Sequence, residues 1–302
     1  MIDAPLSAGA TLLGPEMAAR LARLSLLARR LPEARRRGRR RTRRVGSGTD
    51  AIDKRGYVPG DDVRRIDWSA YARFERLLVR VVADDAPLRL GLLIDASGSM
   101  AFGAPTKLTQ AARVAAGLAA VAVGGEDRCA LLAPGRGPAI RAPGGPMGLR
   151  RILVALEALA PEGPTALGDA ARAMRAALGG RGLCVVLSDL WDPAGALHAA
   201  QLLRDAGHDV VLARVLTPFE VDPPDDLDGL TVEDAETGEL LELAPSGVRG
   251  AYLDAYAAHL AELEAGAAEL GATLLPVRTD EPFDDVILRA LSSGILSRRS
   301  VA

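Results

Sequence analysis

From residue 88 onward, short apolar runs alternate with longer Ala-rich segments, and this alternation constrains the fold more than any other feature of the chain. The short runs have the length of buried strands and cover 88–94, 128–133, 139–141, 183–188, 209–216 and 272–278. The segments between them are long enough for helices and cover 107–123, 149–159, 167–178, 194–206, 248–270 and 284–291. Alternating strands and helices predict an α/β fold: a doubly wound, mostly parallel sheet flanked by helices.

The remaining segments divide the chain into three predicted parts. Residues 1–49 form an N-terminal extension, in which apolar residues at helical spacing precede an Arg-rich arm. Residues 50–87 are rich in turn-forming Pro, Gly and Asp, and end in an apolar run typical of a strand at 77–82. The α/β domain then occupies 88–302, with a small β insertion predicted at 218–247.

The basic arm gives the chain an uneven charge. Ten arginines lie between Arg29 and Arg44 against the single acid Glu33, which gives a local charge of +9. Because the whole chain carries −2, the remainder carries −2 − 9 = −11. Such an arm can bind nucleic acid, an anionic surface or an acidic partner, or it can fold onto the acidic body. No base-reading motif accompanies it and aromatic residues are only 3% of the chain, so nucleic-acid binding is not the expected main function.

Cysteine content and hydropathy predict a cytoplasmic protein. Cys129 and Cys184 both lie in apolar runs, which favours buried thiols over a disulfide framework. No apolar region at the N-terminus has the form of a signal peptide, and no uncharged stretch is long enough to span a bilayer.

The most informative residues follow the apolar run at 88–94. Asp95-Ala96-Ser97-Gly98-Ser99 places one carboxylate and two hydroxyls in the loop after a strand, where ligands bind in doubly wound sheets. Thr165 opens a later helix and Asp189 follows the strand at 183–188, so both reach the same sheet edge. All of these donors are oxygens, which suit a hard cation such as Mg²⁺, with Mn²⁺ or Ca²⁺ as alternatives. The predicted ligands are Asp95, Ser97, Ser99, Thr165 and Asp189.

This constellation resembles the metal-ion-dependent adhesion site of von Willebrand factor A domains, and the resemblance covers about residues 88–292. It implies that a bound metal accepts an Asp or Glu carboxylate from a partner protein. The structural alternative is a capping Asp and Ser pair in a strand-to-helix loop.

The segment upstream resembles the signature of the bacterial DUF58 family. Residues 55–68 read Arg-Gly-Tyr-Val-Pro-Gly-Asp-Asp-Val-Arg-Arg-Ile-Asp-Trp, Ala72-Arg73 follows, and Leu-Thr-Pro-Phe-Glu at 216–220 with Tyr252 also fits. The resemblance covers about residues 40–295 and implies a co-chaperone or adaptor that works with a MoxR-type AAA+ ATPase and a client protein. In one interpretation the signature is a docking surface for that ATPase; in the other it is a turn and salt-bridge assembly in which Trp68 packs against the sheet. The candidate docking residues are Tyr57, Asp61, Asp62, Arg64, Arg65, Asp67, Trp68 and Arg73.

The sequence does not predict an enzyme or a small-molecule substrate. No Gly-x-Ser-x-Gly surrounds Asp95, and no histidine can be assigned as a base for its serines. Ser97 stands where aspartyl phosphatases carry a second Asp, and the chain has no phosphate-binding Gly-x-x-x-x-Gly-Lys-[Ser/Thr] loop. A metal-dependent adaptor is therefore expected, with a metal-independent scaffold as the alternative.

Overall fold

The computed structural model describes residues 12, 14–35, 51–58, 63, 66–82, 89–124, 127–244 and 246–293. The chain divides into two compact units, one formed by residues 1–32 and 88–297 and the other by 33–87 and 298–302. The arginine-rich arm at 36–44 and the side chains of Arg29, Arg30 and Arg35 lie outside what is described.

A six-stranded sheet forms the centre of the larger unit, in the order β10-β7-β6-β3-β4-β5. All neighbouring strands are parallel except β4 and β5, which pair antiparallel at one edge. This arrangement confirms the predicted doubly wound, mostly parallel sheet. The strands are β3 (Arg89–Ile94), β4 (Arg128–Leu132), β5 (Ile140–Ala142), β6 (Leu183–Ser188), β7 (Asp209–Leu216) and β10 (Thr273–Arg278).

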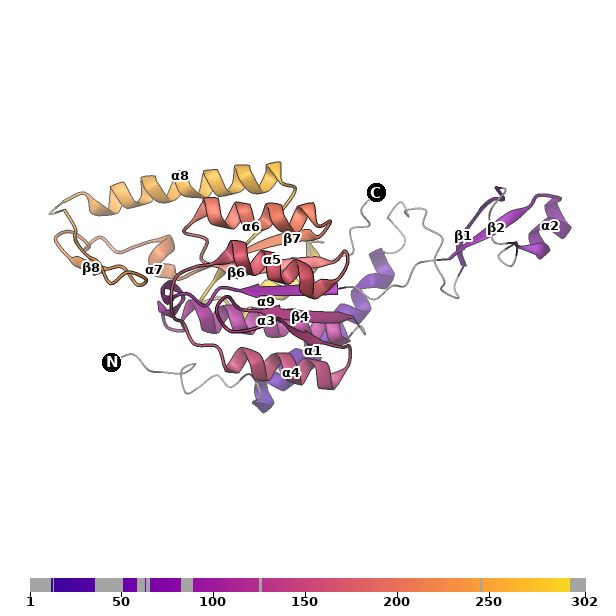
Figure 1. Ribbon diagram of the computed structural model, residues 1–302, viewed down its shortest axis with the longest axis horizontal. Helices are drawn as coiled ribbons and strands as arrows, with labels where there is room; N and C mark the ends of the chain where they lie inside the picture. Colours follow the sequence, from indigo (N-terminus) through magenta and orange to yellow (C-terminus); the bar gives the residue numbers. More distant parts are fainter. Residues whose placement is uncertain are drawn as a thin grey trace. The chain divides into compact units, whose positions relative to one another are not determined.

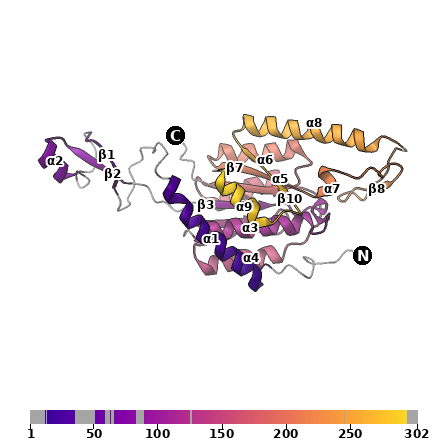
Figure 2. The same ribbon diagram turned by 180° about the vertical axis from the view of Figure 1, so that it is seen from behind.

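Helices cover both faces of this sheet (Figures 1 and 2). One face carries α1 (Pro15–Arg35), α3 (Lys107–Gly124), α4 (Pro146–Glu157) and α9 (Phe283–Ser292). The other face carries α5 (Leu167–Leu178), α6 (Pro193–Asp205) and α8 (Val248–Glu269). The small side chains of α3 let its neighbours approach closely: a Cβ on Gly117 would stand 3.0 Å from Ile287 of α9. None of the described helices is both long enough and apolar enough to cross a membrane.

The strand order reverses direction at β3. From β3 the chain moves to β4 on one side, and it later returns to add β6 on the other side of β3. In doubly wound sheets this reversal is the topological switch point, where the two outgoing connections diverge and leave room for a ligand. Asp95 directly follows β3 and Asp189 directly follows β6, so both predicted carboxylates lie at this point.

The predicted insertion contains the short helix α7 (Pro218–Val221) and the hairpin of β8 (Thr231–Glu233) and β9 (Leu240–Glu242). The hairpin was expected from the sequence, whereas α7 was not. Both lie beyond the end of the sheet where the parallel strands finish (Figure 1). Every residue of β8 and β9 is exposed, so the hairpin has little core of its own.

The smaller unit pairs β1 (Ala51–Gly56) with β2 (Leu78–Val82) in an antiparallel ladder and carries α2 (Trp68–Phe74). The strand at 77–82 was predicted, but β1 and α2 were not. Asp67 begins α2, since its Oδ1 accepts hydrogen bonds from the backbone N–H groups of Ser69 and Ala70, each at 3.1 Å. Within this unit Trp68 is not a core residue. Ala70 is the buried residue of α2, and Trp68 on the first turn is 60% exposed.

Candidate metal centre

The loop after β3 is shaped by Asp95 itself. The backbone N–H of Asp95 donates to Leu187 O at 2.8 Å, which extends the β3–β6 pairing by one residue. Its Oδ1 then accepts a hydrogen bond from the backbone N–H of Ser97 at 3.0 Å, and the chain turns into a short 3₁₀ helix, η2 (Gly98–Ala101). Asp95 is only 1% exposed, so the turn holds a carboxylate inside the protein.

Hydroxyl groups surround this carboxylate. Asp95 Oδ2 accepts from Ser188 Oγ at 2.7 Å and from Thr165 Oγ1 at 3.3 Å. The hydroxyls of Ser97 and Ser99 lie 3.1 Å apart in the same loop. Four of the five predicted ligands, Asp95, Ser97, Ser99 and Thr165, are therefore gathered at one place.

Two backbone hydrogen bonds fix the loop that carries Thr165. The N–H of Glu162 donates to Ala96 O at 2.8 Å, and the N–H of Gly98 donates to Gly163 O at 2.8 Å. These bonds run in opposite directions between the two loops and so hold them in register. Thr165, two residues after Gly163, is kept beside Asp95 by the backbone and not only by its own side chain.

Asp95 is a buried anion with neutral partners. Burial raises the pKa of its carboxyl, and the negative charge of Asp189 raises it further, against the hydrogen bonds from Ser188 and Ser97 that lower it. Among the residues that the structure describes, no basic side chain forms an ion pair with Asp95. Nor do three or more His, Cys, Asp or Glu side chains converge as a metal-binding group anywhere in that part of the chain. The donor set is thus one carboxylate with hydroxyls, which fits a hard cation better than zinc.

Asp189, the fifth predicted ligand, has a different partner. Its Oδ2 accepts a hydrogen bond from Lys107 Nζ at 2.6 Å, and the same ammonium lies 2.7 Å from Glu220 Oε1. Lys107 is 2% exposed, so its Nζ contacts both carboxylates inside the protein. One oxygen of Asp189 is therefore committed to a lysine and does not join the hydroxyl network around Asp95.

Glu220 links this lysine to the insertion. Its Oε2 accepts from the backbone N–H of Thr217 at 2.7 Å and from Thr217 Oγ1 at 2.9 Å, which caps α7. Its Oε1 also accepts from Trp191 Nε1 at 3.2 Å, and its backbone carbonyl accepts from the Tyr252 hydroxyl at 2.6 Å. The Leu-Thr-Pro-Phe-Glu segment at 216–220 is thereby tied to the sheet edge.

A third acidic residue, Glu236, reaches the centre from the hairpin. Its Oε1 accepts from Thr165 Oγ1 at 3.1 Å, and its Oε2 accepts from the backbone N–H of Thr165 at 3.4 Å. The turn between β8 and β9 lies very close to the loop after Asp95, because a Cβ on Gly98 would stand 2.4 Å from Ala235 O. Only a glycine at 98 leaves room for this approach.

Sequence reasoning missed Lys107, Glu220 and Glu236. One signal was available for Lys107: it is one of only two lysines, with Lys54, among 37 basic residues, and all the others are arginine. A compact ammonium fits between the buried carboxylate of Asp189 and the partly buried one of Glu220, where a planar guanidinium takes more room. Nothing in the sequence marked Glu236, because its contact with Thr165 depends on how the β8–β9 hairpin folds back against the loop that carries Thr165.

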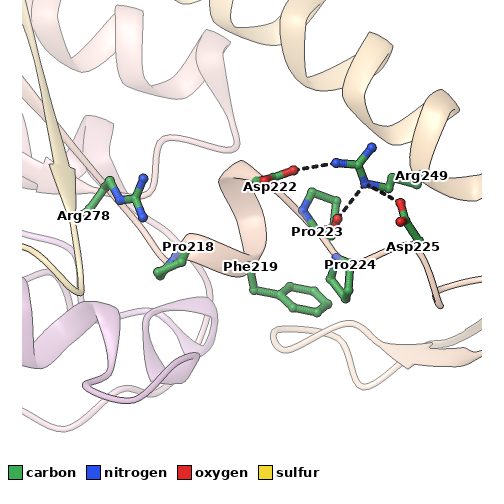
Figure 3. Close-up of a pocket in the computed structure, with 8 residues that line it drawn as sticks. All are labelled: Pro218, Phe219, Asp222, Pro223, Pro224, Asp225, Arg249 and Arg278. Carbon is green, nitrogen blue, oxygen red and sulfur yellow. Dashed lines mark hydrogen bonds and ion pairs between the residues drawn. The ribbon is translucent and has the colours of Figure 1, made fainter.

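A hollow of about 590 Å³ lies beside α7 (Figure 3). Arg249 crosses it and pairs with Asp222 at 2.6 Å and with Asp225 at 3.2 Å. The two acidic residues that line the hollow are therefore already paired with Arg249. None of the residues that line the hollow belongs to the hydrogen-bond network around Asp95. The lining is formed by Pro218, Phe219, Asp222, Pro223, Pro224, Asp225, Arg249 and Arg278.

The candidate docking residues of the signature divide by position. Asp67 is buried as the cap of α2, whereas Trp68 and Arg73 are exposed and Tyr57 is half-buried. The rings of Trp68 and Tyr71 meet edge to face with centroids 6.3 Å apart. The other four predicted residues, Asp61, Asp62, Arg64 and Arg65, lie outside the described part of the chain.

Fold and site together define a doubly wound α/β protein with an oxygen-rich, partly charged centre at its switch point. The family described as "Protein of unknown function DUF58" matches residues 53–262, and the chain belongs to this family. The uncharacterized proteins Rv1480 of Mycobacterium tuberculosis and Mb1516 of Mycobacterium bovis are each 32% identical to it over 257 residues, which is 82% of this chain and 80% of theirs.

Two solved structures are similar to this chain at low identity. The conserved hypothetical protein BatB from Bacteroides thetaiotaomicron matches with 18% identity and a TM-score of 0.43, over 70% of this chain and 100% of BatB. The SpRpn10 VWA domain matches with 15% identity and a TM-score of 0.40, over 68% of this chain and 95% of that domain.

Proposed function

We propose that this chain is a protein-interaction adaptor that binds a divalent cation, Mg²⁺ in the first place, at the Asp95 centre and docks a partner's carboxylate on it. The observation that carries the proposal is the state of Asp95. A carboxyl group that is 1% exposed and has only neutral hydrogen-bond donors either takes up a proton or needs a positive charge to offset the cost of burying its anion, and a bound cation supplies that charge.

The residues present fit such an ion. Asp95 supplies the charged oxygen, and Ser97, Ser99 and Thr165 supply hydroxyl oxygens of the kind that Mg²⁺, Mn²⁺ and Ca²⁺ accept. Asp189 adds negative charge nearby while Lys107 holds one of its oxygens. With so few charged ligands, a bound cation keeps positive charge to attract an outside carboxylate.

The proposal includes no catalytic step. In the described residues, the hydroxyls of Ser97 and Ser99 pair with each other and not with a histidine. Asp95 accepts from the hydroxyls of Ser188 and Thr165, and within the described residues neither hydroxyl is hydrogen-bonded to a histidine that could act as its base. Recognition, and not turnover, is the function that these contacts favour.

The proposed partner is a MoxR-type AAA+ ATPase, with a client protein as a second partner. Membership of the DUF58 family supports this proposal. The chain then contributes recognition through the metal, and the ATPase contributes hydrolysis. Affinity capture of the purified ATPase by the full chain, with Mg²⁺ and then with a chelator, tests it: capture that a chelator abolishes is expected, and absence of capture in both conditions contradicts it.

Calorimetric titration of the full chain with Mg²⁺ and Mn²⁺ tests the metal centre directly. Wild type is expected to bind one ion, and Asp95→Asn is expected to bind none. Asp169→Asn is a matched control, because Asp169 is an exposed carboxylate on α5 that forms an ion pair with Arg172. Absence of binding to wild type, or equal binding to wild type and Asp95→Asn, contradicts the proposal.

Lys107 favours a second candidate, a metal-independent scaffold. Its ammonium already supplies one positive charge at this sheet edge, between Asp189 and Glu220. In that case partner capture is unchanged by a chelator and is lost on Lys107→Met. The same capture experiment therefore separates the two candidates.

A further inference from the structure

The turn between β8 and β9 reaches the candidate metal centre, and it does so with a carboxylate. Glu236 accepts hydrogen bonds from both the hydroxyl and the backbone N–H of Thr165, a predicted metal ligand. The described hairpin is exposed on both strands and at the turn of residues 234–238. Its hydrogen bonds to Thr165 come from one side chain at the tip, that of Glu236.

The shape of the turn fixes where Glu236 points. Asp234 Oδ1 accepts from the backbone N–H groups of Glu236 at 2.9 Å and Thr237 at 2.7 Å, and from Thr237 Oγ1 at 2.9 Å. The backbone N–H of Gly238 closes the turn by donating to Asp234 O at 2.8 Å. Glu236 is therefore presented by a preformed turn, much as a partner's loop would present an acidic residue.

Thr165 cannot satisfy the two carboxylates that approach it. Its Oγ1 lies 3.3 Å from Asp95 Oδ2 and 3.1 Å from Glu236 Oε1. A hydroxyl carries one hydrogen and donates to only one of them. The other contact brings the hydroxyl oxygen against a carboxyl oxygen, which is favourable only if that carboxyl carries a proton or if a positive charge is shared among the three groups. A cation held by Asp95 and Thr165 supplies that charge.

The hairpin can leave the centre at small cost. Its strands have three residues each and are exposed throughout, and a two-stranded hairpin of this size is only marginally stable alone. Segments with few buried contacts open locally far more readily than the core. Displacing Glu236 therefore does not require the sheet or its helices to unfold.

From these contacts we propose that Glu236 is a built-in ligand of the metal centre, which occupies the place of a partner's carboxylate until that carboxylate displaces it. This inference rests on the proposed function, because it requires a cation at Asp95. It adds a regulation: the chain holds its own docking position closed, and only a partner whose carboxylate competes with Glu236 can engage the metal.

The test compares two variants of one hairpin, Glu236→Gln and Glu239→Gln, in the full chain. Both remove one negative charge from exposed glutamates, but only Glu236 touches Thr165. In Mn²⁺ titrations followed by calorimetry, Glu236→Gln is expected to bind about tenfold more weakly than wild type, as loss of a ligand or its close support does. Glu239→Gln is expected to match wild type. Equal affinities of the two variants overturn the proposal.

A second measurement tests the competition. Acetate is added to the Mn²⁺-loaded proteins, and its binding is followed by the loss of water from the ion in proton relaxation. Acetate must displace Glu236 in wild type and only water in Glu236→Gln, so it is expected to bind the variant about tenfold more tightly. Equal acetate affinity overturns the competition. Failure of wild type to bind Mn²⁺ at all is a different result, which overturns the metal centre itself.

Discussion

The loops after β3 and β6 place two buried carboxylates side by side, but only one of the two forms an ion pair with a basic side chain of the described residues. Asp95 and Asp189 follow adjacent parallel strands and are 1% and 3% exposed. Asp189 is paired with the ammonium of Lys107 at 2.6 Å. Asp95 has only hydroxyl and backbone N–H donors within the described residues.

The difference teaches which carboxylate can take a metal. A buried anion is kept charged by a basic side chain or by a bound ion, or else it takes up a proton. At Asp189 the chain has supplied its own cation, which would repel a second one placed against the same oxygen. At Asp95 the described residues supply hydroxyl oxygens that could bind a metal, but no basic side chain. Of these two adjacent carboxylates, Asp189 is therefore suited to pair with a lysine and Asp95 is suited to bind a metal.

Loss of the lysine is expected to give the largest effect. Lys107→Met leaves the buried Asp189 and the partly buried Glu220 without this countercharge, and breaking a buried pair such as Lys107 and Asp189 costs about 3–5 kcal/mol of unfolding free energy. Urea unfolding in EDTA at neutral pH measures it. Lys107→Arg keeps the charge but overfills the space, and about 1–3 kcal/mol is expected. A Met variant as stable as wild type would remove the basis of the comparison.

Lys107 also marks the limit of what the sequence predicts. The strand and helix alternation predicted the sheet, its flanking helices and the hairpin, because periodicity and length are local properties. The Asp-x-Ser-x-Ser turn, Thr165 and Asp189 were placed at one sheet edge because parallel strands end together. None of this indicates which side chain pairs with which.

Pairing depends on contacts between distant segments. Lys107 lies 82 residues before Asp189 in the chain, and Glu236 lies 71 residues after Thr165. Neither separation leaves a periodic pattern. The exposure of Trp68 also depends on such contacts, because Ala70 and Ile66 fill the interior of that small unit. Asp67, by contrast, sits where a helix cap belongs, and its role follows from local geometry.

Addition of the metal is expected to give the next largest change in stability, and this change is expected to depend on Asp95. Mn²⁺ at about 100 times its dissociation constant stabilises the form that binds it by about 2.7 kcal/mol. Thermal unfolding of wild type is expected to shift upward accordingly, and that of Asp95→Asn is expected not to move. Asp169→Asn, which alters an exposed carboxylate, is expected to follow wild type. An equal shift in Asp95→Asn would mean that the ion binds elsewhere.

Asp189→Asn is expected to cost about 2 kcal/mol of unfolding free energy in EDTA, because it removes a charge-assisted hydrogen bond and leaves Lys107 with Glu220 alone. Its Mn²⁺ affinity is expected to fall far less than that of Asp95→Asn. Unfolding in urea gives the first quantity and calorimetry the second. If Asp189→Asn abolishes Mn²⁺ binding as completely as Asp95→Asn does, Asp189 binds the ion directly and the contrast between the loops is wrong.

The smallest effect is expected to have the opposite sign. Burial raises the pKa of Asp95 above its ordinary value of 3.8, so the folded protein holds this proton more tightly than the unfolded chain does. In EDTA, wild type therefore loses stability as the pH rises from about 4 through the raised pKa, and Asp95→Asn, which cannot ionise, does not. At neutral pH the variant is expected to equal wild type or exceed it by about 1 kcal/mol, since an isosteric amide removes the buried charge, still accepts from the Ser97 N–H and donates to the hydroxyls of Ser188 and Thr165 where Asp95 accepted from them. Urea unfolding of both proteins from pH 4 to 7 measures the difference. A loss for Asp95→Asn as large as that for Asp189→Asn would show that the Asp95 charge is already compensated within the chain, and the metal would then have no place there.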